Sequence, residues 1–159
     1  MSYNARSYAI YVHGNQLYGG LPYSTHLDAV VAVLKEFGNF DQHLIDAAYL
    51  HDVLEDTHIT KETLDATFAQ ETVLLVSLVT DQPGKNREER HKATYPGIAL
   101  HPKAVTLKLA DRIANMRDAL ANGKGALMTM YRKEYPQFKF MLMGEHHGAM
   151  WAELDRLLR

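Results

Sequence analysis

The stretch "AAYLHDVLEDT", from Ala47 to Thr57, sets several ionisable groups into a strongly apolar run. Residues three and four apart share one face of a helix, so Asp52, Glu55 and Asp56 are expected to project together. His51 lies beside them, while the leucines and the valine take the apolar side. Carboxylates on the core side of a helix are costly to bury unless a positive charge lies among them. The stretch therefore predicts a helical core that holds a cation, and a divalent metal ion is the simplest candidate.

The composition is that of a globular protein of one domain. The chain has 159 residues, of which 47% are hydrophobic and 23% charged. A net charge of −2 argues against a nucleic-acid partner. No apolar run approaches the roughly 18 residues of a membrane-spanning helix, and "MSYNARSYAIYVHGNQ" lacks the pattern of a secretion signal. We expect a cytoplasmic protein without a membrane partner.

The periodicity is helical almost throughout, so we predict an all-α fold, a single helical bundle of about 7–10 helices. Loop signals separate the helices, among them "GGLPYST", "QPGKN" and "NGKG". The expected helices cover Tyr3 to Gln16, Ser24 or Thr25 to Glu36, Asp41 to about Glu55, a region from Thr60 through "ETVLLVSLVTD", the charged and exposed "REERHKATY", the long "HPKAVTLKLADRIANMRDAL", and two or three helices in the tail, interrupted near Pro136 and Gly144.

Cysteine is absent, so any metal must be held by histidine and carboxylate side chains. His51 and Asp52 alone would make a poor site. His26, at the start of the second helix, and Asp111, between apolar residues of the long helix, are the best further candidates. Such mixed nitrogen and oxygen ligation suits Mn, Fe, Co or Zn better than Ca. Each piece also has a simpler interpretation: His51 and Asp52 as a surface ion pair, His26 as a helix-terminal residue, and Asp111 as a salt-bridge partner.

The order of these residues resembles a known pattern. His26, then the "HD" pair at 51–52, then Asp111 is the order found in the HD phosphohydrolase superfamily. The segments "LHDVLEDT" and "LKLADRIANMR" are similar to the hydrolase domain of RelA/SpoT homologues and of small alarmone hydrolases. "PYSTH" at 22–26 and "LVTD" at 78–81 also resemble family segments. The family-like core covers about residues 13–120 of the single domain 1–159, and residues 121–159 form a helical C-terminal extension.

The resemblance implies a chemistry. An enzyme of this type removes the 3′-pyrophosphate of (p)ppGpp by means of a metal-activated water, with one divalent ion, commonly Mn²⁺. The implied ligands are His26, His51, Asp52 and Asp111. Glu55 and Asp56 match the catalytic acidic pair, and their proximity should raise the pKa of one of them. Asn115 and Arg117 match a segment that lies beside the nucleotide.

The chain departs from the family in the segment "QLYGGLPY", where an Arg-Lys pair usually precedes "PY". Tyr18 stands roughly where the arginine would. Tyrosine can stack on a purine but lacks the positive charge. An adenine alarmone such as (p)ppApp is therefore admissible beside the guanine one. For the phosphates we expect Lys108, three residues before Asp111, and Arg87, although most of the charged run around Arg87 fits a solvated surface.

Two alternatives remain open at this stage. The first is an HD nucleotidase or phosphatase that acts on another nucleotide, such as a deoxynucleotide or an NADPH-type cofactor. The second is a non-catalytic nucleotide-sensing or antitoxin protein, although a binder has no need of Glu55 and Asp56. Met, Phe and Trp at helical spacing in "FKFMLM" and "AMWAELDRLL" suit a core. They would also suit a homodimer face.

Overall fold

The computed structural model describes residues 4–159 and confirms the all-α prediction. Within these residues there are ten helices, of which α4 is a single turn, and one β-hairpin whose two strands have two residues each. The elements are α1 (Ala5–His13), β1 (Leu17–Tyr18), β2 (Leu21–Pro22), α2 (Ser24–Glu36), α3 (Gln42–Leu50), α4 (Val53–Asp56), α5 (Lys61–Thr67), α6 (Gln70–Val79), α7 (Arg87–Ala99), α8 (Pro102–Ala121), α9 (Gly125–Leu142) and α10 (Gly148–Leu157).

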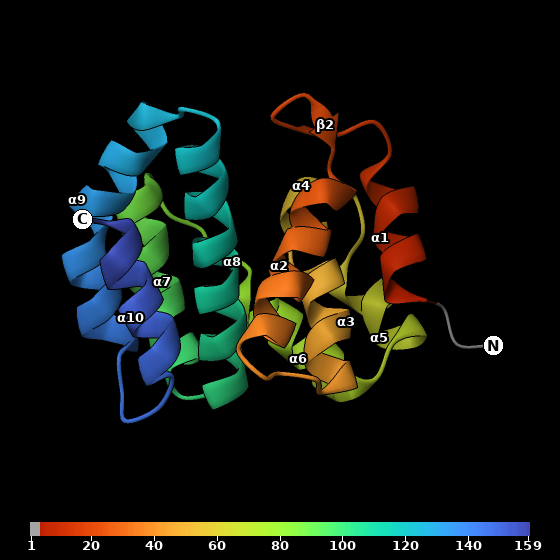
Figure 1. Ribbon diagram of the computed structural model, residues 1–159. Helices are drawn as coiled ribbons and strands as arrows, with labels where there is room; N and C mark the ends of the chain where they lie inside the picture. Colours follow the sequence, from red (N-terminus) through yellow and green to blue (C-terminus); the bar gives the residue numbers. More distant parts are fainter. Residues whose placement is uncertain (1–3) are drawn as a thin grey trace.

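Helix α8 is the centre of the bundle. It contacts α2, α3 and α6 on one side and α7, α9 and α10 on the other (Figure 1). Pro102 occupies the first turn, where its missing N–H leaves no hydrogen bond unmade. More than half of the helix is buried, because both halves of the molecule pack against it. A polar residue in the middle of α8 therefore lies close to side chains from several helices.

The apolar core is one cluster that runs from Ala5 to Leu157. The C-terminal helices belong to it: Phe138 and Trp151 are almost fully buried, and their ring centroids lie 5.6 Å apart. Phe138 in turn contacts Tyr95 of α7, with centroids 5.7 Å apart. Residues 121–159 therefore complete the bundle around α8 rather than standing apart from it.

Two helix ends differ from the sequence prediction. The first helix ends at His13 rather than Gln16, because Gly14 has a φ of +57° that stops the helix. The predicted start at Tyr3 lies outside the described residues. The third helix ends at Leu50 rather than near Glu55, and the chain turns at residues 51–52 before α4 begins. Because of this turn, adjacent side chains 51 and 52 can reach the same point, which a straight helix would not allow.

The region from Thr60 to Val79 forms two helices, α5 and α6, instead of one. Thr60 caps α5 by accepting a hydrogen bond from the backbone N–H of Thr63. The predicted helical state of "ETVLLVSLVTD" is confirmed over Gln70–Val79.

The prediction that "REERHKATY" is exposed was wrong for one face of α7. His91, Thr94, Tyr95 and Ile98 are buried, at the spacing of a helical stripe. The predicted break near Pro136 was also wrong, since α9 continues through it. Pro136 and the residue four before it are both exposed, so the carbonyl that loses its partner faces solvent. The predicted break near Gly144 is confirmed.

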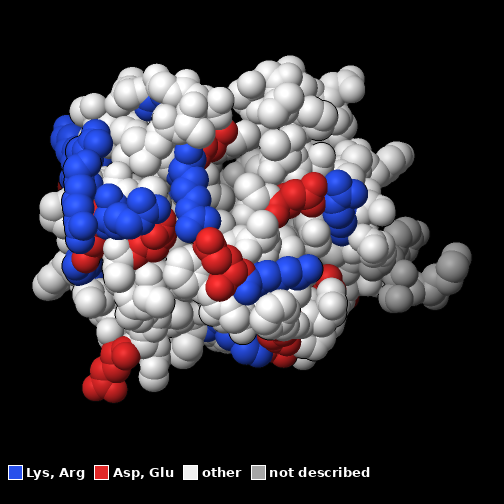
Figure 2. Space-filling model, in the orientation of Figure 1, with Lys and Arg blue, Asp and Glu red and all other residues white. Residues whose placement is uncertain are grey.

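The visible surface mixes both signs of charge, with Lys and Arg gathered over the C-terminal helices (Figure 2). Many of these cations are paired there, as Lys139 is with Asp155 and Arg156 with Glu153. Among the described residues, no helix is both long and apolar enough to cross a membrane.

Candidate metal centre and catalytic cavity

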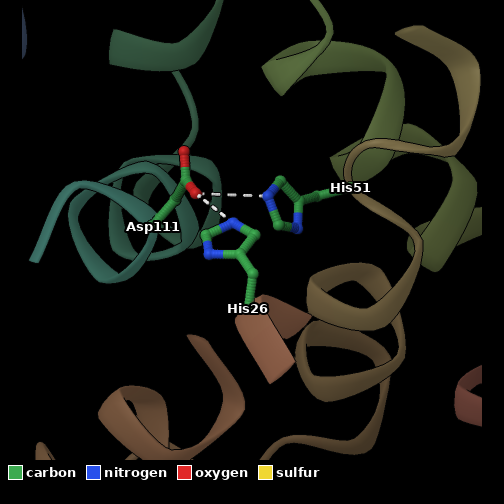
Figure 3. Close-up of side chains that lie close together, drawn as sticks. All are labelled: His26, His51 and Asp111. Carbon is green, nitrogen blue, oxygen red and sulfur yellow. Dashed lines mark ion pairs between the residues drawn. The ribbon is translucent and has the colours of Figure 1, made fainter. Parts of the chain in front are cut away.

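Three side chains from separate elements meet beside α8 (Figure 3). His26 comes from the first turn of α2, His51 directly follows α3, and Asp111 lies in the middle of α8. Asp111 Oδ1 lies 3.0 Å from His26 Nε2 and 3.2 Å from His51 Nε2. One ligand atom from each of the three lies within 4.8 Å of the others, which is the spacing of a metal-binding group.

Asp52 is the fourth member of the cluster. Its Oδ2 lies 3.0 Å from His51 Nε2 and 3.7 Å from His26 Nε2. The Tyr23 hydroxyl donates a hydrogen bond to the same oxygen. This contact orients the carboxylate in the way that outer hydrogen bonds orient the ligands of metal sites. The four residues expected as ligands are thus brought together.

The hydrogen bonding of His51 fits a metal ion. Its Nδ1 lies 2.6 Å from the carbonyl oxygen of Ala48, an acceptor, so Nδ1 carries the proton. In the neutral imidazole, Nε2 then carries a lone pair and no proton. That buried atom has no hydrogen-bond partner, yet it faces carboxylate oxygens of Asp52 and Asp111. A lone pair among negative oxygens is repulsive unless a cation lies between them, so this donor set suits a divalent ion.

The charges of the cluster shift one another's protonation. Burial acts to lower the pKa of His51, but Asp52 and Asp111 outweigh it and raise the pKa well above its usual range. Burial acts to raise the pKa of Asp111, but the two histidines outweigh it and hold the pKa well below its usual range. Burial also acts to raise the pKa of Asp52, but His51 and His26 outweigh it and lower the pKa. The ionised carboxylates therefore favour a positive charge among them, which either a proton on His51 or a bound cation supplies.

The cluster opens into a cavity of about 240 Å³. Glu55 and Asp56 lie at its mouth and are exposed to solvent on one side. Glu55 accepts a 2.6 Å hydrogen bond from the backbone N–H of Asp81. Partial burial raises the pKa of Glu55; the Asp81 hydrogen bond opposes this shift, and the charges of Asp52 and Asp81 add to it. We expected the raised pKa to come from Asp56, but the contributing carboxylates are these two.

Three cationic side chains also contribute to the cavity. Lys108, Arg87 and Arg112 line it. Lys108 Nζ lies 3.8 Å from Asp111 Oδ2, which leaves room for a further anion beside the ammonium. Arg87 and Arg112 both pair with Glu134, at 2.5 and 3.5 Å. A cavity that combines carboxylates and histidines with cationic side chains suits a metal-bound, multiply charged anion.

Tyr18 lies at the edge of this site. Its hydroxyl donates a 2.7 Å hydrogen bond to Asn115, whose amide donates to Asp111. Its ring stacks on the His26 imidazole, with centroids 4.7 Å apart, and the Lys124 ammonium lies 5.0 Å from its centroid. Tyr18 directly precedes the tight turn of the hairpin, which Gly19 and Gly20 form at positive φ. The ring therefore braces a candidate metal ligand as well as facing the rim of the site.

Arg117 does not line the cavity. It pairs with Glu36 at 2.8 Å and with Glu153 at 3.4 Å, on another face of α8. The reason is helical geometry, because six residues after Asp111 correspond to a rotation of about 240°. Asn115, four residues after Asp111, stays on the cavity side.

The sequence reasoning missed several residues that the fold brings to the cavity. These are Tyr23, Val79, Asp81, His91, Leu107, Arg112 and Tyr131. The spacing of Arg112 from Lys108 and the position of Tyr23 in "PYSTH" were usable signals. The resemblance of "LVTD" at 78–81 to a family segment was a usable signal for Asp81, which the packing of α6 against α3 brings to the site.

A family model described as "HD domain" matches residues 5–134, most of the chain. The chain belongs to the HD-domain family. The His51–Asp52 pair at the metal centre is the "HD" of the sequence pattern. Membership accounts for a divalent metal site built from these residue types.

Other HD-domain proteins with assigned activities are similar in sequence. The chain is 35% identical over 118 residues to the guanosine-3′,5′-bis(diphosphate) 3′-pyrophosphohydrolase MESH1 of Danio rerio, matching 70% of this chain and 65% of that protein. It is 37% identical over 114 residues to a probable guanosine-3′,5′-bis(diphosphate) 3′-pyrophosphohydrolase of Synechocystis. That match covers 66% of this chain but 15% of the relative. The chain thus spans less than two thirds of the length of either relative.

The fold of this chain also matches a solved structure over the whole length of the chain. A metazoan orthologue of SpoT that hydrolyses ppGpp superposes with a TM-score of 0.79 at 24% identity, covering 100% of this chain and 97% of that one. A Listeria monocytogenes protein, lmo0812, superposes with a TM-score of 0.69 at 24% identity, covering 86% of this chain and 95% of that one. The C-terminal helices α9 and α10 are therefore part of a known all-α arrangement.

Proposed function

We propose that this HD-domain protein is a metal-dependent nucleotide pyrophosphohydrolase that removes the 3′-pyrophosphate of an alarmone, (p)ppGpp or (p)ppApp. One observation carries the proposal: a four-residue metal cluster and an acidic pair share one cavity with three cationic side chains. The activities named for the relatives from Danio rerio and Synechocystis support the same reaction class. In this reaction the oxygen of water bonds to the phosphorus next to the 3′ oxygen and the bond from that phosphorus to the 3′ oxygen breaks. The 3′ oxygen takes up a proton as the leaving group, and pyrophosphate and the 5′-diphosphate nucleotide are released.

His26, His51, Asp52 and Asp111 would hold one divalent ion, for which we propose Mn²⁺. Nitrogen and oxygen ligands in equal number are typical of Mn, Fe, Co or Zn sites, and the family resemblance favours manganese. The ion would supply polarisation of a phosphoryl oxygen and a lowered pKa for water. Tyr23 and Ala48 keep two of the ligands oriented through the contacts at Asp52 and His51.

Glu55 and Asp56 would orient the attacking water and take up its proton. Both carboxylates lie at the cavity mouth, where water has access. The raised pKa of Glu55 makes it a stronger base than an ordinary glutamate, and a base works better as its pKa moves toward the working pH. A protein that merely bound the nucleotide would gain nothing from two further acids beside the metal cluster, so catalysis is favoured over sensing.

Lys108 and Arg87 would hold the phosphates. Lys108 pairs with the Asp111 carboxylate and lines the same cavity as the metal cluster. Arg87 donates from Nε and Nη2 to Glu134, which leaves Nη1 outside this ion pair, and the residue lines the cavity. The pyrophosphate that leaves carries several negative charges, and these cations would stabilise it as it forms.

Tyr18 and Asn115 would lie beside the nucleoside. Tyr18 lacks the positive charge and the donor fork of an arginine, so neither purine is singled out by charge. We therefore include guanine and adenine alarmones in the substrate class. A cytoplasmic location and a homodimer complete the proposal; the absence of cysteine fits a reducing compartment. The exposed Phe140 and Met143 would suit a dimer face.

The experiment is a side-by-side turnover of ppGpp and ppApp with Mn²⁺, with and without a chelator. Chromatography separates the products. Pyrophosphate and the matching 5′-diphosphate nucleotide are expected, and chelation should abolish both. Release of orthophosphate instead would favour a nucleotidase. An Asp52→Ala variant that kept full biological effect would favour a binding protein.

A further inference from the structure

Asp56, at the end of α4, is held by a hydrogen-bond chain that begins at the end of α1. The Gln16 side chain donates from Nε2 to Asp56 Oδ2 at 2.9 Å. Its other end, Oε1, lies 2.8 Å from His13 Nδ1. His13 is the last residue of α1, Gln16 precedes the hairpin, and Asp56 ends α4. The chain therefore joins three separate segments at the mouth of the cavity.

The direction of the chain follows from chemistry. A carboxylate accepts, so the Gln16 end that faces Asp56 is the NH₂ group. Gln16 Oε1 must then accept, and His13 Nδ1 must donate. The reverse orientation would set an amide oxygen against a carboxylate oxygen and an N–H against a donor. With its proton on Nδ1, His13 thus supports the amide orientation that the Asp56 carboxylate requires.

His13 is itself immobilised. Its side chain is buried, with 7% of the residue exposed, and its ring lies 4.6 Å from the Tyr23 ring. The backbone of Gln16 is also tied, because its carbonyl accepts from Tyr23 N–H at 3.2 Å and its N–H donates to His13. The His13 ring and the Gln16 backbone are therefore both fixed, and a fixed support is what a catalytic group needs to keep a productive geometry.

The two members of the acidic pair are supported differently. Glu55 accepts from a backbone N–H, which no substitution at Gln16 would remove. In residues 4–159, the Gln16 amide is the one side chain that donates to the Asp56 carboxylate. It occupies Oδ2 and leaves Oδ1 to accept from a water. Loss of Gln16 would free Asp56 to rotate while the metal cluster and Glu55 remained in place.

We propose that Gln16, oriented by His13, is a positioning residue for the Asp56 carboxylate in hydrolysis. This rests on the proposed function, since it assigns Asp56 a part in that reaction. The effect of Gln16 passes through Asp56, and Gln16 itself contacts neither metal nor phosphate.

Steady-state kinetics with Mn²⁺ and ppGpp test the role. Gln16→Ala should lower kcat by about 10–100-fold, the usual cost of a misplaced catalytic group, and leave KM and Mn²⁺ affinity within about twofold. In an Asp56→Ala background the same change should have no further effect, because the two residues act as a unit. Equal losses in both backgrounds, or an unchanged kcat, would overturn the proposal.

His13 offers a rescue test. His13→Asn keeps a donor near the position of Nδ1, whereas His13→Ala removes it. The asparagine variant should retain more of the wild-type kcat than the alanine variant at matched thermal stability. Equal kcat values for the two variants would contradict the orienting role. Gln42→Ala is the matched control, since it removes an exposed Gln–Asp pair of 2.8 Å away from the cavity and should leave kcat unchanged.

A second readout needs no turnover. In ¹⁵N spectra of the Mn²⁺-free protein, the side-chain amide signals of Gln16 should shift in Asp56→Asn and stay in place in Asp46→Asn. Unmoved signals in Asp56→Asn would rule out the contact. If the wild type hydrolysed no alarmone, the proposed function would fail, and this shift would still decide whether Gln16 holds Asp56.

Discussion

His51 Nε2 lies 3.2 Å from Asp111 Oδ1, although the two residues belong to different halves of the bundle. The imidazole is fixed from behind, because Nδ1 lies 2.6 Å from the Ala48 carbonyl oxygen. The ring is therefore held with Nε2 toward the Asp111 carboxylate. A fixed orientation of this kind reduces the cost of ordering the ligands.

Removing either partner should abolish metal binding. We expect His51→Ala and Asp111→Asn to weaken Mn²⁺ affinity by more than about 100-fold, since loss of an outer contact alone typically costs 10–100-fold. The Mn²⁺ affinity is measured by isothermal titration calorimetry, and the metal content of the desalted protein gives an independent check. His43→Ala, which changes a partly exposed histidine that contacts Glu71 and Thr72 and none of the four ligands, should bind as the wild type does. Full occupancy in either cluster variant would refute the assigned ligand set.

Changing the acidic pair should separate catalysis from metal binding. Glu55→Gln keeps an oxygen for the Asp81 N–H but cannot take up a proton. We expect kcat to fall by about 10²–10⁴-fold while Mn²⁺ affinity stays within a few-fold. The same is expected of Asp56→Asn. Glu88→Gln, which breaks an exposed pair with Lys92, is the control. A kcat within threefold of wild type for Glu55→Gln would exclude Glu55 as the proton acceptor.

Substitution of Lys108 should act on substrate binding. Lys108→Met removes a charge next to the cavity while keeping the length of the side chain. A charge-assisted hydrogen bond contributes about 1.5–3 kcal/mol, so KM should rise by roughly 10–100-fold. Arg87→Met should raise KM less, because Arg87 is already paired with Glu134. Lys61→Met, in an exposed pair with Asp65, should change nothing. A KM that stays at the wild-type value in Lys108→Met would remove Lys108 from the phosphate site.

Glu134 should make stability depend on pH. Burial acts to raise its pKa, but the Arg87 hydrogen bond and the charges of Arg112 and Arg87 outweigh it and leave the pKa lowered. A lowered pKa in the folded state contributes stability that is present above the unfolded pKa, about 4.3. This stability is lost as pH falls through the folded value.

Denaturant titrations of the wild type and Glu134→Gln at several pH values test this. Near pH 7 the variant should be less stable by about 1–3 kcal/mol, partly because the buried Arg112 loses its counter-charge. The difference should shrink as pH falls below about 4.3. A difference that stayed constant down to pH 3 would mean that the pKa of Glu134 is not lowered.

The C-terminal helices should unfold together with the rest of the chain, as a single domain over residues 1–159 requires. Trp151 is 2% exposed and lies against Phe138, so Trp151→Ala should cost about 3–5 kcal/mol. The unfolding should remain one transition by both circular dichroism and fluorescence of the remaining tyrosines. Phe140→Ala, at a residue 90% exposed, should have little effect. Two separate transitions would show that residues 121–159 fold independently.

Sequence periodicity determined the helical class and the elements that carry His26, His51 and Asp111. It could do so because the spacing of apolar residues shows which face of a helix is buried, and this spacing is a property of the local sequence. The same spacing separates Asn115 from Arg117, since they lie on different faces of α8. The buried face of α7 was also readable from the spacing of His91 and Ile98, despite the charge of that segment.

Tertiary structure alone decided the contacts that make a site of these residues. The turn after Leu50 sends His51 and Asp52 to one point, and no local pattern required the helix to stop there. The approach of Gln16 to Asp56 likewise depends on how α1 packs against α4. A chain specifies its helices through interactions within a few residues, whereas distances between side chains on different helices depend on the packing of the whole core.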